Sequence, residues 1–296
     1  MRGSPRTWTI LLLSPSVGLL AVFVFIPMAL SIWLSFQQWS TQTPFTAAHW
    51  IGLGNYSEIF GYGPVGRDFR QALANTLIYS AESILVILPL SVALAVLLHQ
   101  AALRKNHILR TVLFSTYMVP MVAVALVWSK LYSPAEGPIN QALGWIGIAP
   151  LSWLSSPDTA LSSLVMLNVW QQTGYFTVLA VAGLTQIPTT IIEAARIDGA
   201  RGLKFFWRVT LPLLRRTLLF SGIIALINAV QVFEPVAMIT QGGPVGSTNV
   251  VTYHIRRVGI ERSEGGLGSA MAMIVMLILG ALVSAIFAAA GRRSEA

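Results

Sequence analysis

Amide and carboxylate side chains stand inside long apolar runs of this 296-residue chain. Asn228, Gln231 and Glu234 are spaced by three residues, which on an α-helix places them within a sector of about 120°. An ionisable group at the centre of a bilayer costs roughly 2.5–3.5 kcal/mol, so such groups usually face a cavity or a partner. The stripe predicts either a wet pathway for a hydroxyl-rich solute or a hydrogen-bonded seam between helices.

Two further sites have the same character. Gln171 and Gln172 lie near the middle of another apolar run and are a second candidate pair for the pathway. Glu82 lies about ten residues into a third run, roughly 15 Å deep at 1.5 Å per residue. We expect Glu82 to be structural rather than part of the pathway.

Catalytic chemistry has no support in the residue types. The chain has no cysteine, which excludes a thiolate nucleophile and cysteine-based metal sites. None of its lysines follows a glycine, so a phosphate-binding P-loop is absent. The four histidines lack metal-ligand spacing and are more typical of membrane-interface side chains; they are His49, His99, His107 and His254. We predict no catalytic residue, no metal site and no ATP hydrolysis by this chain.

The elements that position these residues are membrane helices. Hydrophobic residues make up 55% of the chain and charged residues only 10%, against about 25% charged in a soluble domain. The mean hydropathy is +0.69. We predict an all-α, polytopic membrane protein with one transmembrane domain, because six runs approach the ~20 apolar residues that a bilayer requires. The predicted spans are approximately 10–36, 72–98, 111–132, 161–184, 217–239 and 268–290.

Basic residues predict the orientation. With the N-terminus inside, 13 of the 19 Lys and Arg residues fall on the inner side and 6 on the outer side, as the positive-inside rule requires. Both termini and the polar segment 185–216 are then cytoplasmic. The net charge of +8 is explained by these span ends, so it does not indicate a nucleic-acid partner.

The segment 185–216 carries signals for an exposed, folded loop. Thr190 and Glu193 have the spacing of a capping box at a helix start. Gly199 suits the left-handed conformation that ends a helix. A second helix is expected from about Gly202 to Thr210, stopping near Pro212.

The same segment resembles the cytoplasmic "EAA" loop of binding-protein-dependent ABC importer permeases. Glu193-Ala194-Ala195 is followed after three residues by Gly199, and after nine more by Val209-Thr210-Leu211-Pro212, with Val209 where Ile is usual. In that family the loop couples the permease to a separate ATPase. The resemblance implies that residues 185–216, called the coupling loop below, dock the ATPase through Glu193, Ala194, Ala195, Asp198 and Gly199.

Other motifs are similar to the maltose-type and glycerol-phosphate-type branch of this family. They are Gly52-Leu53-Gly54-Asn55-Tyr56, Asn75-Thr76, Trp170-Gln171-Gln172-Thr173-Gly174, and Thr240-Gln241-Gly242-Gly243-Pro244 followed by Thr248. The long extra outer domain and additional N-terminal helices of some maltose-type subunits are missing. This departure leaves the solute open between a sugar, a sugar alcohol and a glycerol-phosphate derivative.

The resemblance implies a transport subunit of the bacterial inner membrane that forms half of a solute pathway. Its expected partners are a second homologous permease, two ATPase subunits that bind ATP and Mg, and an extracytoplasmic solute-binding protein; the chain itself needs no cofactor. One alternative is an autonomous secondary transporter, although six spans and a docking loop argue against it. The other is a polytopic membrane enzyme, which would need clustered catalytic groups.

Overall fold

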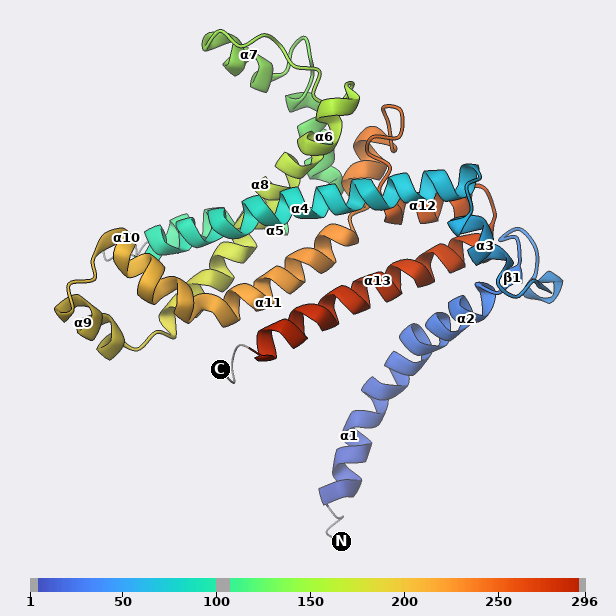
Figure 1. Ribbon diagram of the computed structural model, residues 1–296, viewed down its shortest axis with the longest axis horizontal. Coiled ribbons are helices and arrows are strands. Elements are labelled where there is room, and N and C mark those ends of the chain that lie inside the picture. The colour runs from blue at the N-terminus through green and yellow to red at the C-terminus, as the bar shows by residue number, and fades with distance from the viewer. Residues whose placement is uncertain (1–4, 100–106, 293–296) are drawn as a thin grey trace. The chain divides into compact units, whose positions relative to one another are not determined.

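The computed structural model describes residues 5–99 and 107–292, and most of them are helical (Figure 1). The described residues form two compact units: residues 5–70 with 254–280, and residues 71–253 with 281–292. The first half contains α1 Pro5–Leu20, η1 Ala21–Phe25, α2 Ile26–Leu34, β1 Gln37–Gln38, η2 Phe45–Ala47, β2 His49–Trp50, α3 Gly54–Phe60, α4 Pro64–His99, α5 His107–Met118, α6 Met121–Leu131 and α7 Pro138–Trp145. The second half contains α8 Pro157–Thr185, α9 Thr189–Ile197, α10 Gly202–Phe205, η3 Phe206–Thr210, α11 Leu211–Val230, η4 Val236–Thr240, α12 Val251–Arg256, η5 Arg257–Glu261 and α13 Gly265–Arg292.

Several of these helices are long and apolar enough to cross a membrane. Among the described residues they are Leu12–Leu34, Pro64–His99, Gly202–Val230 and Gly265–Ala290. Two bent pairs also qualify: Ile108–Met118 with Met121–Leu131, and Pro157–Thr185 with Thr189–Ala195. The chain is therefore an all-α polytopic membrane protein, and its described residues hold four spans by this criterion, or up to six if each bent pair is one span.

The segment predicted as the span 111–132 is broken rather than straight. α5 and α6 meet at an angle of 95° across Val119 and Pro120. Proline has no N–H to donate and its ring clashes with the preceding turn, so it ends α5. Gln171 Nε2 of α8 donates to Val119 O at 3.1 Å, which satisfies a carbonyl that the break leaves free.

The segment predicted as the span 217–239 is displaced towards its N-terminal side. Helical structure runs from Gly202 through Pro212, because the π-turn η3 lets Leu211 N donate to Phe206 O before the proline. The expected stop near Pro212 is therefore wrong. The helix instead ends at Val230, with Gln231 as its C-cap. Pro235 cannot donate to Gln231 O, so the helix cannot continue through it.

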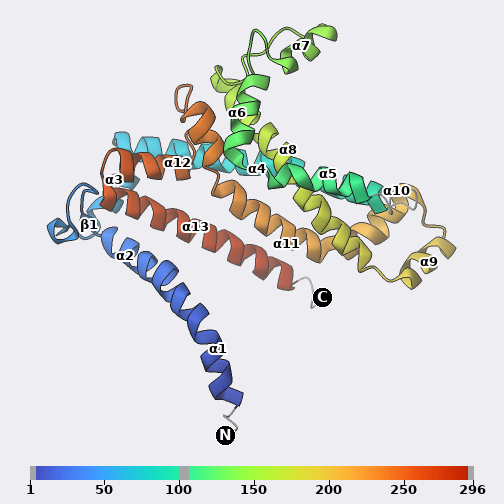
Figure 2. The same cartoon turned by 180° about the vertical axis from the view of Figure 1, so that it is seen from behind.

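The unit of residues 71–253 packs around α8. A Cβ on Gly174 would collide with Leu113 O of α5, and one on Gly183 would lie 2.6 Å from Thr217 Oγ1 and 2.9 Å from Leu214 Cδ2 of α11. The two glycines therefore allow α5 and α11 to approach α8 closely, as Figures 1 and 2 show. Buried apolar side chains from α4, α8 and α11 fill the space beside Gly183, among them Ala95, Val181 and Leu214.

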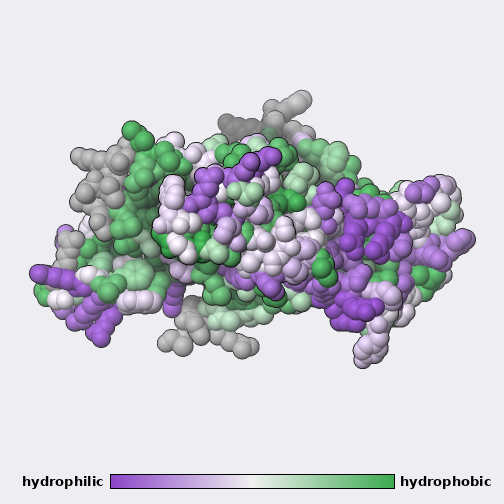
Figure 3. Space-filling model, turned by 90° about the horizontal axis from the view of Figure 1, so that it is seen from above, coloured by the Kyte–Doolittle hydropathy of each residue, from purple (hydrophilic) through white to green (hydrophobic). Residues whose placement is uncertain are grey.

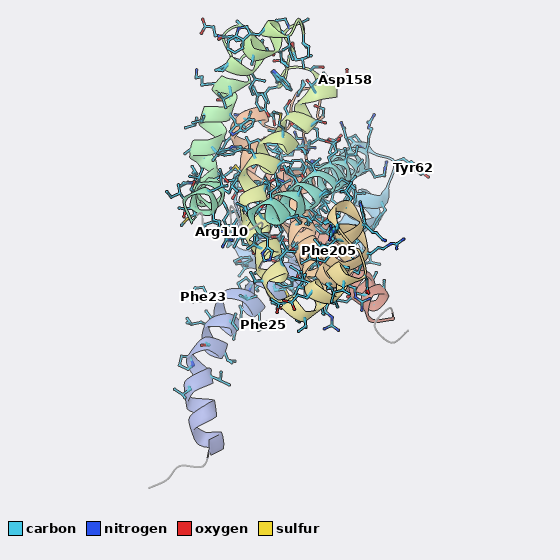
Figure 4. All side chains as sticks on the ribbon, turned by 90° about the vertical axis from the view of Figure 1, so that its left-hand side faces the viewer. Phe23, Phe25, Tyr62, Arg110, Asp158 and Phe205 are labelled. Carbon is cyan, nitrogen blue, oxygen red and sulfur yellow. The ribbon has the colours of Figure 1, made fainter. Side chains whose placement is uncertain are left out.

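The other unit contains the first apolar helix and a short hairpin. β1 pairs with β2 in antiparallel register, and Asn55 Nδ2 donates to both Ser35 O and Gln37 O at 2.9 Å. The stretch Leu12–Leu34 buries few of its residues. Phe23 and Phe25, labelled in Figure 4, are 72% and 56% exposed. Such an apolar surface is suited to lipid or to a partner helix.

Candidate functional site

The coupling loop begins with α9, which contains Glu193, Ala194 and Ala195. The helix starts at Thr189, and Pro188 O accepts a hydrogen bond from Ile191 N at 3.1 Å. Thr190 is therefore the second residue of the helix and cannot be its N-cap, so the predicted capping box is wrong. Pro188, whose φ is fixed near the helical value, precedes the first turn and lets it form one residue early.

The end of α9 has the predicted geometry. Gly199 adopts a φ of +73°, Asp198 N donates to Ala194 O at 3.0 Å, and Ala200 N donates to Ala195 O at 2.9 Å. A left-handed residue closed by such a long backbone bond is a common helix C-terminus. Apart from its two chain neighbours, no described residue comes within 4 Å of the position that a Cβ on Gly199 would take.

The coupling loop leaves much of its surface uncovered. Glu193, Ala194, Asp198 and Gly199 are exposed, while Ala195 is half-buried. Two aliphatic side chains are also uncovered, Ile197 at 86% and Leu203 at 77% exposure. Among the described side chains from Thr189 to Arg208, none makes a hydrogen bond or ion pair with another part of the chain.

A cavity of about 400 Å³ adjoins this surface. It is lined by Ala200, Arg201, Gly202 and Phe205, the last of which is labelled in Figure 4. Exposed aliphatic side chains beside a hollow are typical of a protein-binding surface. The loop can therefore receive side chains from a partner without first rearranging its own packing.

The predicted pathway residues do not form one helical stripe. Asn228 lies near the end of α11, Gln231 caps it, and Glu234 follows the break, so the expectation of one continuous polar helix face is wrong. All three side chains are nevertheless exposed. Each therefore remains available to a cavity or to a partner chain, and their role in a pathway stays a prediction.

The two glutamines of α8 differ from each other. Gln171 is 5% exposed and its amide is engaged with Val119 O. Gln172 is half-buried, and its Oε1 has no hydrogen-bond partner among the described residues. Gln171 thus holds the α5–α6 break, which favours a structural role for it, whereas Gln172 keeps an acceptor free.

Glu82 lies at a cavity that the sequence did not predict. Ser162 Oγ donates to Glu82 Oε2 at 3.0 Å. We use "outer cavity", after the side predicted from Lys and Arg, for the surrounding space of about 450 Å³, lined by Gln71, Asn75, Ile78, Glu82, Pro157, Asp158, Leu161, Ser162, Val245 and Ser247. All of these residues belong to one compact unit. The spacing of Gln71, Asn75 and Glu82 on α4 was the available signal, because residues four and eleven apart share a helix face.

The loop that borders this cavity is held by many hydrogen bonds. We use "outer loop" for residues 241–250. Asn75 Nδ2 donates to Gly246 O at 2.8 Å and to Asn249 O at 3.1 Å. Thr248 Oγ1 lies 2.6 Å from Gly243 O and 2.7 Å from Thr240 Oγ1. Just after the loop, Val251 N donates to Thr76 Oγ1 at 2.8 Å.

Metal chemistry finds no support in residues 5–99 and 107–292, where no three His, Asp or Glu side chains are placed to hold an ion. Hydrophobic side chains instead reach the molecular surface in many places, shown in green in Figure 3. This exposed apolar surface is typical of a membrane protein.

Comparison with protein families supports this interpretation. The family model described as "Binding-protein-dependent transport system inner membrane component" matches residues 87–295. The probable ABC transporter permease YurN of Bacillus subtilis is 33% identical over 264 residues, which cover 88% of each chain. The trehalose/maltose transport system permease MalF of Thermococcus litoralis is 29% identical over 272 residues, covering 91% of this chain and 88% of the relative.

Solved structures show the same fold. A chain of a bacterial ABC transporter that imports the acidic polysaccharide alginate matches with a TM-score of 0.81 and 23% identity, over 97% of this chain and 96% of that one. A chain from the alginate transporter bound to its pentasaccharide-loaded periplasmic protein matches with a TM-score of 0.80 and 22% identity, over 95% and 93% of the two chains.

Proposed function

Because the chain belongs to the family of inner-membrane components of binding-protein-dependent transport systems, we propose that it forms half of the translocation pathway for a carbohydrate in an ATP-driven importer. It is a permease subunit, the transport component of an ABC importer. The carbohydrate is supported by relatives that are named for the transport of trehalose and maltose, starch degradation products and sulfoquinovosyl glycerol.

The coupling loop is the proposed ATPase-docking surface. The observation that carries this is the uncovered α9, with Glu193, Ala194 and Asp198 exposed beside Ile197 and the open space at Gly199. A short helix with small residues lets a partner backbone approach closely, and its exposed aliphatic side chain can fill a hollow in the partner. ATP binding by the partner would then displace α9 and the helices attached to it.

The proposed assembly has one further permease, two ATPase subunits and an extracytoplasmic solute-binding protein. ATP and Mg bind to the ATPase subunits, and this chain supplies no cofactor site of its own. Both termini and the coupling loop face the cytoplasm, as the distribution of Lys and Arg predicts. Asn228, Gln231, Glu234 and Gln172 are the proposed pathway residues, because each has side-chain polar atoms without a hydrogen bond among the described residues, whereas the amide of Gln171 is bonded to Val119 O.

The test is a substitution at Gly199 in the complete, reconstituted complex. Gly199→Trp should reduce solute-stimulated ATP hydrolysis to the unstimulated rate, since the indole occupies the space that the partner needs. A φ of +73° disfavours most side chains other than Asn. Gly199→Ala is therefore the matched control for backbone strain, because its Cβ brings the strain of a positive φ without the bulk of an indole, and it should retain most of the stimulation. Full stimulation in assembled Gly199→Trp complexes would refute docking at α9.

A further inference from the structure

The outer cavity brings together amide, carboxylate and hydroxyl side chains that have no role in the coupling loop or among the proposed pathway residues. Gln71, Asn75 and Glu82 reach it from one face of α4, and Asp158 and Ser162 from the start of α8. Glu82 lies within a predicted span, and no ion pair involves it among the described residues. An ionisable residue kept in a membrane helix without a countercharge usually serves a solute or ion path.

The cavity offers a ligand more hydrogen-bond acceptors than donors. The Asn75 amide donates to the outer loop at Gly246 O and Asn249 O, and the Gln71 amide donates to Gly246 O at 3.3 Å. Both N–H groups of Asn75 and one of the two of Gln71 are thus committed, while neither amide oxygen has a hydrogen-bond partner among the described residues. Glu82 accepts one bond from Ser162, and each carboxylate has about four lone-pair sites. The groups left for a ligand are therefore mainly acceptors.

The charge of the cavity has one sign as well. Two carboxylates, Glu82 and Asp158, line it, and no Lys, Arg or His is among the described residues that do. Hydroxyl groups of a neutral sugar can donate to these oxygens, and Ile78 and Leu161 provide an apolar wall for the C–H face of a ring. A phosphate, sulfonate or uronate would instead meet like charge, which is how sites commonly reject a wrong ligand. The volume of about 450 Å³ lies within the usual range for small-molecule sites, about 300–1,000 Å³.

We infer that the outer cavity is a hydroxyl-binding subsite for a neutral sugar and that Glu82 and Asp158 disfavour anionic solutes there. This inference rests on the proposed carbohydrate import and narrows it. It sets this chain apart from relatives named for sulfoquinovosyl glycerol, and it disfavours a glycerol-phosphate solute. It also changes the role of Glu82 from a structural group to a ligand acceptor.

The absence of cysteine makes the charge of the cavity directly measurable. Ser162→Cys places one thiol at the cavity, called the cavity thiol below. Thr46→Cys places a matched control thiol on the exposed segment η2, where no Asp, Glu, Lys or Arg lies nearby in sequence. Both variants are assembled into the complete complex and treated with a cationic and an anionic methanethiosulfonate reagent of similar size.

The measured quantity is the ratio of the cationic to the anionic labelling rate. This ratio should be at least tenfold higher at the cavity thiol than at the control thiol, because two carboxylates attract the cationic reagent. Adding Glu82→Gln and Asp158→Asn to the Ser162→Cys chain should remove most of the difference.

Protection by solutes tests the ligand class. Maltotriose, trehalose and raffinose serve as neutral probes, and trigalacturonate and glycerol 3-phosphate as anionic probes. At least one neutral probe should slow the labelling of the cavity thiol severalfold, whereas neither anion should, and none should protect the control thiol. Equal reagent ratios at the two thiols, protection by an anion, or protection by no neutral probe would overturn the inference. Failure of the cavity thiol to react with either reagent would show that a partner covers the cavity, which also overturns it.

The same preparations separate this inference from the proposed function. ATP-driven uptake of a neutral sugar into proteoliposomes is measured with the unsubstituted chain and with Glu82→Gln. If ATP-driven uptake occurs but the cavity thiol shows no charge preference, only the subsite is wrong. If no sugar is taken up in an ATP-dependent manner by the unsubstituted complex, the proposed function itself fails, whatever the labelling shows.

Discussion

The outer loop and the coupling loop both connect helices, but they hold their shape by different means. In the outer loop Thr248 and Val250 are fully buried and Asn249 is 4% exposed, and hydrogen bonds from Asn75 fix its carbonyls. In the coupling loop, the described residues from Thr189 to Arg208 are held by backbone hydrogen bonds and not by side-chain ones, and Ile197 is 86% exposed. A loop that satisfies itself can define a binding site in the isolated chain. A loop whose exposed side chains make no hydrogen bonds within its own chain leaves them available to a partner that covers it.

The largest expected effect comes from removing one bond that holds the outer loop. Thr76 is 2% exposed, and its Oγ1 accepts the hydrogen bond of Val251 N at 2.8 Å. Thr76→Val keeps the volume but leaves a buried N–H unpaired, which costs about 1–3 kcal/mol. We expect a clearly lower melting temperature of the purified complex, measured by thermal unfolding.

Thr185→Val is the matched control for this substitution. The hydroxyl of Thr185 makes a hydrogen bond as well, in this case as the donor, to Ala182 O at 2.7 Å. Unlike Thr76, Thr185 is exposed, near the start of the coupling loop. Water replaces its lost bond, so its effect should stay within about 0.5 kcal/mol. Equal losses in the two variants would remove the distinction between the loops.

Gln171 and Gln231 show the same contrast between a buried, hydrogen-bonded side chain and an exposed one. Gln171→Leu leaves Val119 O without its partner beside the α5–α6 break, so stability should fall by about 1–3 kcal/mol. Gln231 is exposed, so Gln231→Leu should lower sugar uptake while the melting temperature of the complex stays unchanged. Wild-type uptake by Gln231→Leu together with a lower melting temperature would assign Gln231 to a seam between subunits.

The smallest effect on stability is expected in the coupling loop itself. Ile197→Asn changes an exposed side chain, so the free energy of unfolding should move by no more than about 0.5 kcal/mol. Retention of the ATPase on the purified permease should nevertheless fall several-fold, since an interface anchor is often worth more than about 1 kcal/mol. Ile260→Asn, at a position 62% exposed on the predicted outer side, should leave ATPase retention unchanged. Loss of retention in both variants would indicate a general defect.

The sequence allowed the all-α class and the ending of α9 to be predicted, because both depend on local signals. Long apolar runs require membrane helices, and Gly199 places a residue suited to a positive φ directly after the last residues of α9. The interruptions were missed because they depend on groups distant in sequence. The break at Pro120 is stabilised by Gln171 of another helix, and no window of hydropathy contains both residues.

The candidate site was predicted unevenly for the same reason. The residues of the coupling loop follow one another in the chain, so their spacing and the family resemblance sufficed to predict an exposed loop there, while their role in docking stays a prediction. The outer cavity is assembled from α4, the start of α8 and the outer loop, and only the fold brings Glu82 to Ser162. Pro212 shows the opposite error, since a proline that reads as a stop is tolerated where a wide turn precedes it.

The close approach of α8 and α11 at Gly183 fixes the base of the coupling loop. This glycine lets α8 contact Leu214 and Thr217 of α11. The two ends of the chain between these helices are therefore held against each other. Under the proposed docking, a displacement of α9 by the partner would be transmitted to α8 and α11 together, because the two helices are in contact at Gly183. The closeness of this helix contact therefore decides how much of the movement of α9 reaches the membrane. A looser contact would let α8 and α11 shift separately, whereas a tight contact makes them move together.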